Sequence, residues 1–310
     1  MRVAVIGQQE FGKSVLEAFI ARGDEVVAVF CAPEKPGAKA DPLKTAALER
    51  GLPLHQFASL RGPEAHDALA ASKADLGIMA YVLQFAPQSF VNIPRLGTIQ
   101  YHPSLLPKYR GPSSINWPII RGDSNTGLTI FRPNDGLDEG PVVLQKETAI
   151  SPDDTLGSVY FDRLFPLGVS AMLEAADLVV AGRHVETVQD EGLASYEGWC
   201  RDAEARIHWP SHVDFVYNLV RGCNPAPGAW TTLNGKKLQI FDCRKHPVRT
   251  FGAVKGKVGE VSEITGTGFF VTAQGGRIEV LRAKADDTKK LPASELAGVL
   301  GLTVGTLLGT

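Results

Sequence analysis

Apolar runs and helical patterns alternate along the first half of the chain. The apolar runs cover residues 2–7, 25–32, 75–81 and 97–104, and apolar positions recur at helical spacing in residues 12–23 and 42–51. Strands that are apolar throughout and alternate with helices are typical of a parallel sheet that is covered on both faces. We therefore predict an α/β fold with a Rossmann-like, mostly parallel sheet and helices on both faces.

The pattern changes near residue 205. A helical pattern spans residues 155–182, with a kink expected at Pro166, and residues 183 to about 205 form a connection. Beyond this point the short apolar runs are separated by glycine and charged turns, at 237–243, 256–264, 268–273 and 277–283. This spacing indicates a small C-terminal β-barrel, which we predict to be OB-like. The expected domains are residues 1–204 and 205–310.

Charge divides at the same place. The whole chain has a formal net charge of -2, but residues 206–310 carry 14 Lys and Arg against 8 Asp and Glu. Seven of these basic residues lie between Lys236 and Lys257, opposed there only by Asp242. Two interpretations stay open, a solvated face of the barrel or a surface for a polyanion.

The chain carries no sequence signal for a metal, a disulfide framework or a membrane span. Its four cysteines form no C-x-x-C pair and lie in unrelated segments. Residues 1–12 lack the long apolar stretch of a signal peptide, and there is no run of about 18 apolar residues. We expect a cytoplasmic protein with reduced thiols, no metal and no membrane partner. The sequence does not indicate an oligomeric state.

The first predicted strand ends in 7-GQQEFG-12, which departs from the dinucleotide signature G-x-G-x-x-G. Gln8 and Gln9 fill positions where a pyrophosphate needs bare backbone. No acidic residue ends the second strand, which reads 29-VFCAP-33. We therefore expect no NAD(P), and expect Gly7 and Gly12 to serve a tight turn and close packing.

Two loops carry the candidate chemistry. The first, 102-HPSLLPKYRG-111, begins at the carboxyl end of a predicted strand, where ligands bind in open α/β sheets. Its prolines would hold His102 at a fixed angle. The second, 134-NDGLDEG-140, lies between two strand-like runs, and Asp138 at its tip can be aimed at a neighbouring strand end. On spacing alone, an ordinary acidic turn is the simpler interpretation of this second loop.

Taken together, the two loops resemble a known pair of signatures. Residues 102–111 are similar to the H-x-S-L-L-P-x-x-R-G motif, and 135-DGLDEG-140 to the D-x-G-x-D-T-G motif, of enzymes that use 10-formyltetrahydrofolate as a formyl donor. Within that family the chain most resembles the N-terminal hydrolase domain of 10-formyltetrahydrofolate dehydrogenase, and methionyl-tRNA formyltransferase more distantly. The segments that carry the closer resemblance are 39-KADPL-43, 164-LFPLG-168, 196-YEG-198 and 221-RGCNPAPGAW-230.

The resemblance assigns the family's catalytic roles to His102 and Asp138. Attack on a formamide carbonyl forms an oxyanion, which needs hydrogen-bond donors where the charge appears. An imidazole can donate to it or take the proton of the nucleophile, and Asp138 would then set the imidazole's tautomer. The family's third residue is an Asn two positions before the histidine. Here it is Gln100, one methylene longer and a candidate oxyanion donor.

The resemblance also implies a flat apolar slot for the pterin ring of the folate. One wall is expected from Leu83, Gln84, Phe85 and Ala86. The polar edge of the ring would be bound by the main chain of the second loop, at Asn134, Asp135, Gly136, Leu137 and Asp138. At Phe85, ordinary core packing is the alternative.

The leading hypothesis is an enzyme that passes the formyl group of 10-formyltetrahydrofolate to water or to an amine. The resemblance covers only the hydrolase domain of the dehydrogenase, so we expect neither its carrier and aldehyde dehydrogenase domains nor NADP-dependent oxidation. The alternative is a methionyl-tRNA formyltransferase. The basic C-terminal segment favours tRNA, but 33-PEKPGAKADP-42 lacks the longer basic insertion of tRNA-formylating relatives. A third hypothesis, a non-catalytic folate-binding regulatory module, conflicts with the retained His102 and Asp138.

Overall fold

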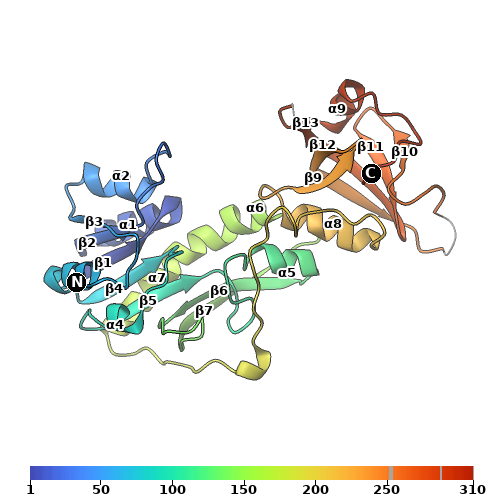
Figure 1. Ribbon diagram of the computed structural model, residues 1–310. Coiled ribbons are helices and arrows are strands. Elements are labelled where there is room, and N and C mark those ends of the chain that lie inside the picture. The colour runs from blue at the N-terminus through green and yellow to red at the C-terminus, as the bar shows by residue number, and fades with distance from the viewer. Residues whose placement is uncertain (251–253, 287, 310) are drawn as a thin grey trace. The chain divides into compact units, whose positions relative to one another are not determined.

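The computed structural model describes residues 1–250, 254–286 and 288–309, and the chain forms two compact units (Figure 1). The first unit comprises Met1–Ser114, Thr126–Thr148 and Phe161–Glu197. The second comprises Ile115–Asn125, Ala149–Tyr160 and Gly198–Thr310. Each unit therefore draws on segments that are not contiguous in the sequence. The boundary between residues 204 and 205 stays a prediction.

A seven-stranded sheet forms the centre of the first unit, in the order β3-β2-β1-β4-β5-β6-β7. Its strands are β1 (Arg2–Gly7), β2 (Glu25–Cys31), β3 (Leu54–Gln56), β4 (Leu76–Ala80), β5 (Thr98–His102), β6 (Asn125–Phe131) and β7 (Val142–Ala149). Strands β1 to β5 pair in parallel, and β6 pairs antiparallel to β5. The predicted mostly parallel sheet is confirmed.

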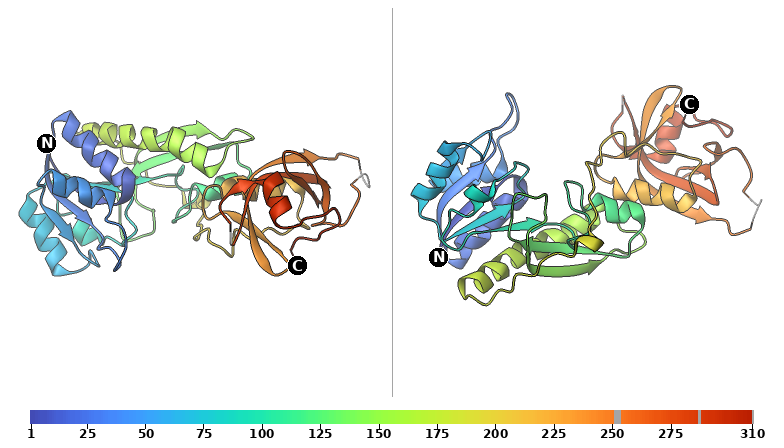
Figure 2. Two further views of the ribbon diagram at one scale, coloured as in Figure 1. Left: turned by 90° about the horizontal axis from the view of Figure 1, so that it is seen from above. Right: turned by 60° about the horizontal axis from the view of Figure 1, so that its bottom comes forward.

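Helices cover both faces of this sheet, as predicted, because successive strand residues point to opposite sides. On one side Val3 and Val5 share a core with residues of α1 (Gln9–Arg22), α2 (Pro42–Glu49) and α7 (Phe165–Val180). On the other side Ala4 and Ile6 pack with α3 (Pro63–Ser72) and α4 (Gln88–Val91). Figure 2 shows α7 running beside α1, in agreement with their many contacts.

The helical pattern at 155–182 forms in three parts rather than one. Helix α6 (Leu156–Val159) is followed by a π-helical turn, Tyr160–Leu164, and then by α7. Thr155 caps α6 by accepting a hydrogen bond from the Ser158 N–H. Pro166 lies in the first turn of α7, where a missing backbone donor costs least. The irregularity expected at Pro166 is therefore a π-helical turn just before it.

The second unit holds a separate antiparallel sheet, in the order β10-β11-β12-β9-β8, with β13 on the side of β12. Its strands are β8 (Ala229–Leu233), β9 (Lys236–Pro247), β10 (Val261–Ile264), β11 (Phe269–Ala273), β12 (Gly276–Ala285) and β13 (Leu291–Pro292). The same unit contains helices α5 (Asn116–Arg121), α6, α8 (Val213–Gly222) and α9 (Ala293–Val299). The predicted antiparallel strands are confirmed, whereas an OB-like barrel stays a prediction.

In the part of the chain that the structure describes, no helix has both the length and the apolar character needed to cross a membrane. The cytoplasmic location stays a prediction.

Candidate functional site

The candidate site lies at the carboxyl end of β5, on one face of the sheet. Ile99 and Tyr101 point to the core that α1 and α7 cover. Strand alternation places Gln100 and His102 together on the opposite face. Gln100 is half-buried, and among the described residues its side chain has no hydrogen-bond partner. It is therefore available for a ligand near His102.

His102 is buried, and each of its ring nitrogens faces a different group. Nε2 lies 2.8 Å from the carbonyl oxygen of Tyr109. Because a carbonyl only accepts hydrogen bonds, Nε2 carries a proton and donates it. Nδ1 faces Oδ2 of Asp138 at 3.6 Å. The main chain of Tyr109 thus sets the imidazole tautomer, not Asp138 as expected from the sequence.

Hydrogen bonds, and not only prolines, hold the loop after His102. Thr129 pairs with His102 across β5 and β6, and its hydroxyl donates to the Ser104 carbonyl (2.7 Å). It also accepts from the Leu106 N–H (3.1 Å) and from the Gln145 amide (2.9 Å). The Ser104 hydroxyl is fully buried and donates to the Lys108 carbonyl (2.6 Å). Ser104 therefore shapes the loop and is not placed to react.

The second loop meets the first through Asp138. Its Oδ2 accepts a hydrogen bond from the Gly111 N–H at 2.9 Å. Asp138 itself has φ 56, a left-handed backbone that is uncommon for a non-glycine residue. Gly111 has φ +105, and a Cβ there would lie 2.2 Å from the Glu197 carbonyl oxygen. The segment that ends at Glu197 therefore passes too close to the first loop for a side chain at Gly111.

The four residues expected to form the pterin wall, Leu83 to Ala86, fall into two groups, and exposed and inward-facing side chains alternate along them. Leu83 and Phe85 are 52% and 43% exposed, so Phe85 is not a core residue. The Arg61 guanidinium lies 4.5 Å over the Phe85 ring. Ala86 is buried in the sheet core, and the Gln84 amide donates to the Phe57 carbonyl at 2.8 Å. Only Leu83 and Phe85 of these four thus present an open apolar surface.

The loop expected to bind the polar edge of the ring lies beside this wall. Asn134 Oδ1 accepts from the Gly136 N–H (2.9 Å), which closes a turn within the loop. Asp135 Oδ1 accepts from the N–H of Gln88 (2.8 Å), at the start of α4 and two residues after Ala86. Leu137 is 55% exposed. The structure therefore brings the two expected folate-binding segments together.

Sequence reasoning missed the residues that join the loops from behind. Arg110 is fully buried and binds Gln189, Glu191 and Tyr196. Gln189 in turn donates to the main chain of Asp138. Gln189 lies in the connection after α7, where neither helical nor strand spacing gives a signal. Tyr196 was marked only by family resemblance.

The turn after β1 differs from a phosphate site. The Gln9 N–H, at the start of α1, donates to both carboxylate oxygens of Asp41, at 3.0 and 2.9 Å. Asp41 also caps α2 by accepting from the Leu43 N–H. A helix N-terminus of this kind would otherwise attract a phosphate. Here a carboxylate of the chain itself already occupies the donor.

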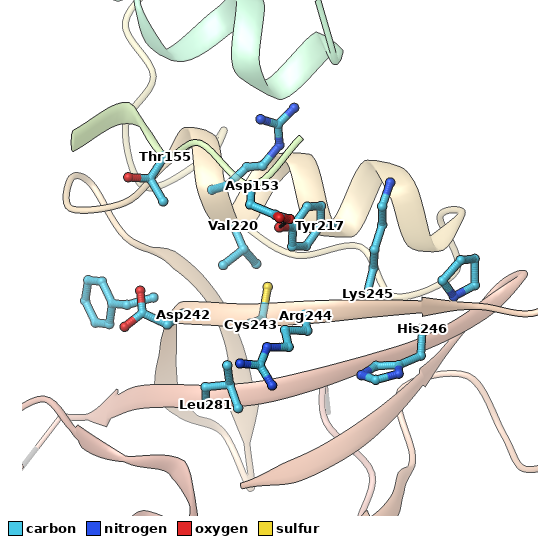
Figure 3. A pocket seen from close by; sticks show the side chains of 13 residues that line it. Asp153, Thr155, Tyr217, Val220, Asp242, Cys243, Arg244, Lys245, His246 and Leu281 are labelled. Carbon is cyan, nitrogen blue, oxygen red and sulfur yellow. Dashed lines mark hydrogen bonds between the residues drawn. The ribbon is translucent and has the colours of Figure 1, made fainter. Parts of the chain in front are cut away.

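A hollow of about 520 Å³ lies in the C-terminal unit, between α8 and the strands β9 and β12 (Figure 3). None of the predicted site residues lines it. The Tyr217 hydroxyl donates to Asp153 at 2.7 Å, and burial raises the pKa of Tyr217. Lys245 projects toward α8 and pairs with Asp214, whose pKa it lowers. These polar groups satisfy one another, which is typical of a structural arrangement.

Two cysteines that the sequence places in unrelated segments lie together in the C-terminal unit. The sulfur atoms of Cys200 and Cys223 are 3.7 Å apart, and both residues are buried. Their hydrogen bond lowers the pKa of the Cys200 thiol and, together with burial, raises that of Cys223. Among the described residues, no group of three or more His, Cys, Asp or Glu side chains could hold a metal ion.

Comparison with known families gives two matches along the chain. A model described as formyl transferase matches residues 1–176, and one described as formyl transferase, C-terminal domain, matches residues 200–300. Together these matches take in both signature loops and most of the C-terminal unit.

Curated relatives include proteins of two different lengths. Cytosolic 10-formyltetrahydrofolate dehydrogenase of Mus musculus is 42% identical over 247 residues, which is 78% of this chain and 27% of the relative. The Xenopus tropicalis protein is 35% identical over 310 residues, which is 95% of this chain and 34% of the relative. The chain thus spans about a third of these dehydrogenases. Methionyl-tRNA formyltransferase of Syntrophus aciditrophicus is 34% identical and is matched along 98% of its length by 99% of this chain.

Solved structures share the fold at low identity. HypX from Aquifex aeolicus in complex with tetrahydrofolic acid has a TM-score of 0.66 at 19% identity, covering 98% of this chain and 48% of that one. WlaRD, a sugar 3N-formyl transferase, has a TM-score of 0.66 at 17% identity, covering 93% and 99%. These likenesses concern the fold alone.

Proposed function

Since this chain belongs to the formyl transferase family, we propose that it takes the formyl group from 10-formyltetrahydrofolate and passes it to water or to a small amine. The observation that carries the proposal is the His102–Asp138 pair. The two signature loops meet where the Gly111 N–H donates to Asp138, and these two residues are 27 positions apart in the sequence. Together the loops present an imidazole and a carboxylate 3.6 Å from each other. The names of the relatives support a folate donor.

In the proposed reaction the nucleophile attacks the formyl carbon while His102 takes its proton. Nε2 is engaged with the Tyr109 carbonyl, so Nδ1 is the nitrogen with a free lone pair. The imidazolium that forms would face the Asp138 carboxylate and be stabilised by it. The proton would then pass from Nδ1 to the departing N10 of the folate, directly or through a water.

Gln100 would stabilise the oxyanion of the tetrahedral intermediate. Its half-buried amide shares a sheet face with His102 and has no partner among the described residues. A donor at this point would contribute about 10²–10³ in rate. The exposed side chains of Leu83, Phe85 and Leu137 would form the slot for the pterin ring.

The second candidate function is a methionyl-tRNA formyltransferase. The relative of that name, which this chain matches along nearly its whole length, favours it. Against it, Lys237 and Lys245 of the basic C-terminal segment already pair with Asp202 and Asp214, which reduces the charge left for phosphates. The loop after β2 also lacks a long basic insertion.

The test is the product formed from 10-formyltetrahydrofolate, alone and with a panel of amines or with methionyl-tRNA. We expect formate or a formylated small amine. His102→Ala and Asp138→Ala should each lower kcat by at least about 100-fold and leave folate binding intact, because both act on the transition state.

The matched control is His208→Ala, which removes an exposed histidine whose hydrogen bond goes to Ser211. It should retain wild-type turnover. Formylated methionyl-tRNA as the sole product would favour the second candidate. Binding of folate with no turnover against any acceptor would favour the regulatory module and contradict the proposal.

A further inference from the structure

Residues 187–197, which we call the strap, pass behind both signature loops. At its start, Thr187 exchanges two main-chain hydrogen bonds with Val142 (2.8 and 2.9 Å). At its end, Ser195 and Glu197 bind the main chain of Arg110, through Arg110 N–H to Ser195 O (2.9 Å) and Glu197 N–H to Arg110 O (2.8 Å). The strap is thus anchored at the base of one loop and at the end of the other.

Gln189 contacts both loops at once. Tyr196 also does so, because its hydroxyl accepts from Arg110 and donates to Glu139 at 2.7 Å. Of the two, Gln189 is the one that binds the main chain of Asp138. It is 6% exposed. Its amide nitrogen donates to the main-chain carbonyls of Asp138 (2.8 Å) and Gly140 (2.7 Å). Its amide oxygen accepts from Nε and Nη2 of Arg110, at 3.2 and 2.8 Å. All four hydrogen-bonding positions of the amide are therefore occupied.

The two carbonyls held by Gln189 flank the tip of the second loop. Asp138 is in the left-handed region there, a conformation that persists only when surrounding contacts impose it. The other observed anchor of Asp138 is its side-chain bond with Gly111, next to the Arg110 that Gln189 also binds. The same amide therefore controls the backbone of Asp138 and the placement of the residue that its carboxylate binds.

We propose that Gln189 is a positioning residue that sets the distance between Asp138 and His102. The inference rests on the proposed function for its catalytic meaning. Gln189 lies behind the loops and acts through Asp138. Without its two donors, the Asp138 backbone is released toward more favourable dihedral angles, and the carboxylate moves away from His102 Nδ1. A misplacement of about 1 Å in a catalytic group costs up to about 100-fold in rate.

The first measurement is a double-mutant cycle with Gln189→Met and Asp138→Asn. Methionine keeps the length of the side chain and removes every hydrogen bond. In the wild-type background Gln189→Met should lower kcat about 10- to 100-fold and change KM for the folate little. In the Asp138→Asn background the same change should alter kcat less than about 2-fold, because the carboxylate to be positioned is gone. An equal loss in both backgrounds would overturn the proposal.

If Gln189→Met does not fold, a second variant tests the same proposal. Gln189→Glu keeps an acceptor for Arg110 and replaces the donors to Asp138 and Gly140 with a carboxylate oxygen that both carbonyls repel. It should therefore show the same loss of kcat and the same cycle. The matched control is Glu191→Gln, which alters a mostly exposed partner of the same guanidinium. It should retain kcat within about 2-fold. A loss at Glu191→Gln as large as at Gln189 would show that Arg110, not Gln189, holds the site.

The second measurement does not need turnover. The ring resonances of an imidazole depend on the charged group that faces it, and Nδ1 of His102 faces Asp138 at 3.6 Å. By NMR at one fixed pH, the His102 ring resonances should therefore move in Gln189→Met in the same direction as in Asp138→Asn. Unmoved His102 resonances in Gln189→Met would overturn the proposal. A wild-type protein that releases no formyl group would overturn the proposed function and leave this readout intact.

Discussion

His102 is bound at one nitrogen by a main-chain carbonyl and faces a carboxylate with the other, at 2.8 and 3.6 Å. The short contact with the Tyr109 carbonyl keeps the proton on Nε2. The longer distance to Asp138 leaves the lone pair of Nδ1 able to accept a proton. Gln100, on the same face of the sheet, is half-buried without a partner among the described residues. At the scale of single residues, the site therefore combines a short main-chain contact at Nε2 of His102 with two groups that no short contact from the described residues holds, Nδ1 of His102 and the Gln100 amide.

Gln100→Asn should change the ratio of hydrolysis to amine transfer. The asparagine amide ends one methylene further back, so the oxyanion donor and the space beside His102 both change. Space that admits water favours hydrolysis, and its loss favours a bound amine. Both products should be measured in the same reaction for wild type and variant. An unchanged ratio with an altered total rate would leave Gln100 as a plain oxyanion donor.

Glu34→Gln should destabilise the protein at neutral pH and less so in acid. Hydrogen bonds from Lys44 and then Gln56 lower the pKa of Glu34 to about 2, below the ordinary value of 4.5. A carboxylate with a depressed folded-state pKa stabilises the fold above its unfolded pKa, and this contribution is lost as pH falls from about 4.5 toward 2.

The expected difference in free energy of unfolding is about 1 kcal/mol at pH 7, since the group keeps contact with solvent. Urea unfolding at a series of pH values should show the two proteins converging below about pH 4.5. Glu49→Gln is the control, because Glu49 is exposed at the end of α2 and has no ion pair among the described residues. A constant difference at all pH values would contradict the assignment.

At the scale of elements, the turn from β1 into α1 depends on how closely β4 approaches it. A Cβ at Gly7 would lie 2.1 Å from the carbonyl oxygen of Ala80, which is main chain and cannot rotate away. A Cβ at Gly12 would meet the Leu43 side chain at 3.2 Å, which can adjust. In 7-GQQEFG-12, Gly7 is therefore required by the main chain of β4, whereas the nearest atom at Gly12 belongs to a side chain that can move.

Gly7→Ala should lower the free energy of unfolding by about 2 kcal/mol or more, because β1 and β4 must separate to admit the methyl group. Gly12→Ala should stay within about 1 kcal/mol of wild type, since alanine favours the helix. Chemical denaturation of the two variants side by side measures the difference. Equal stabilities would mean that the Gly7 backbone can relax.

At the scale of the whole molecule, a folate should protect the chain against heat and NADP should not. A ligand that binds only the native state raises Tm according to its concentration relative to Kd. The folate slot is expected from exposed apolar side chains, whereas Asp41 occupies the first donor of the α1 N-terminus. Thermal melts with 5-formyltetrahydrofolate and with NADP test this. A shift with NADP alone would overturn the cofactor prediction.

The sequence by itself determined the alternation of strands and helices and the two loops that carry His102 and Asp138. Those features are local and can be recognised in short stretches of sequence. A strand that is buried on both faces is apolar throughout, and the reactive side chain of a signature loop lies within a few residues of the rest of its motif. For the same reason, helical spacing located α7 but not the π-helical turn before it. The 3.6-residue period of an α-helix and the longer period of a π-helix cannot be told apart over the five residues Tyr160–Leu164.

Only the tertiary structure decided how the two loops meet. The Tyr109 carbonyl that binds His102 has no signal in the sequence, because a main-chain acceptor is present at every residue. The Gln189 side-chain amide has none either, because it lies in a connection without helical or strand spacing. The 3.7 Å approach of Cys200 to Cys223 is equally invisible, as their segments are separated by helix α8. Such contacts depend on where the folded backbone brings distant segments, and that path is set by packing of the whole unit rather than by local pattern.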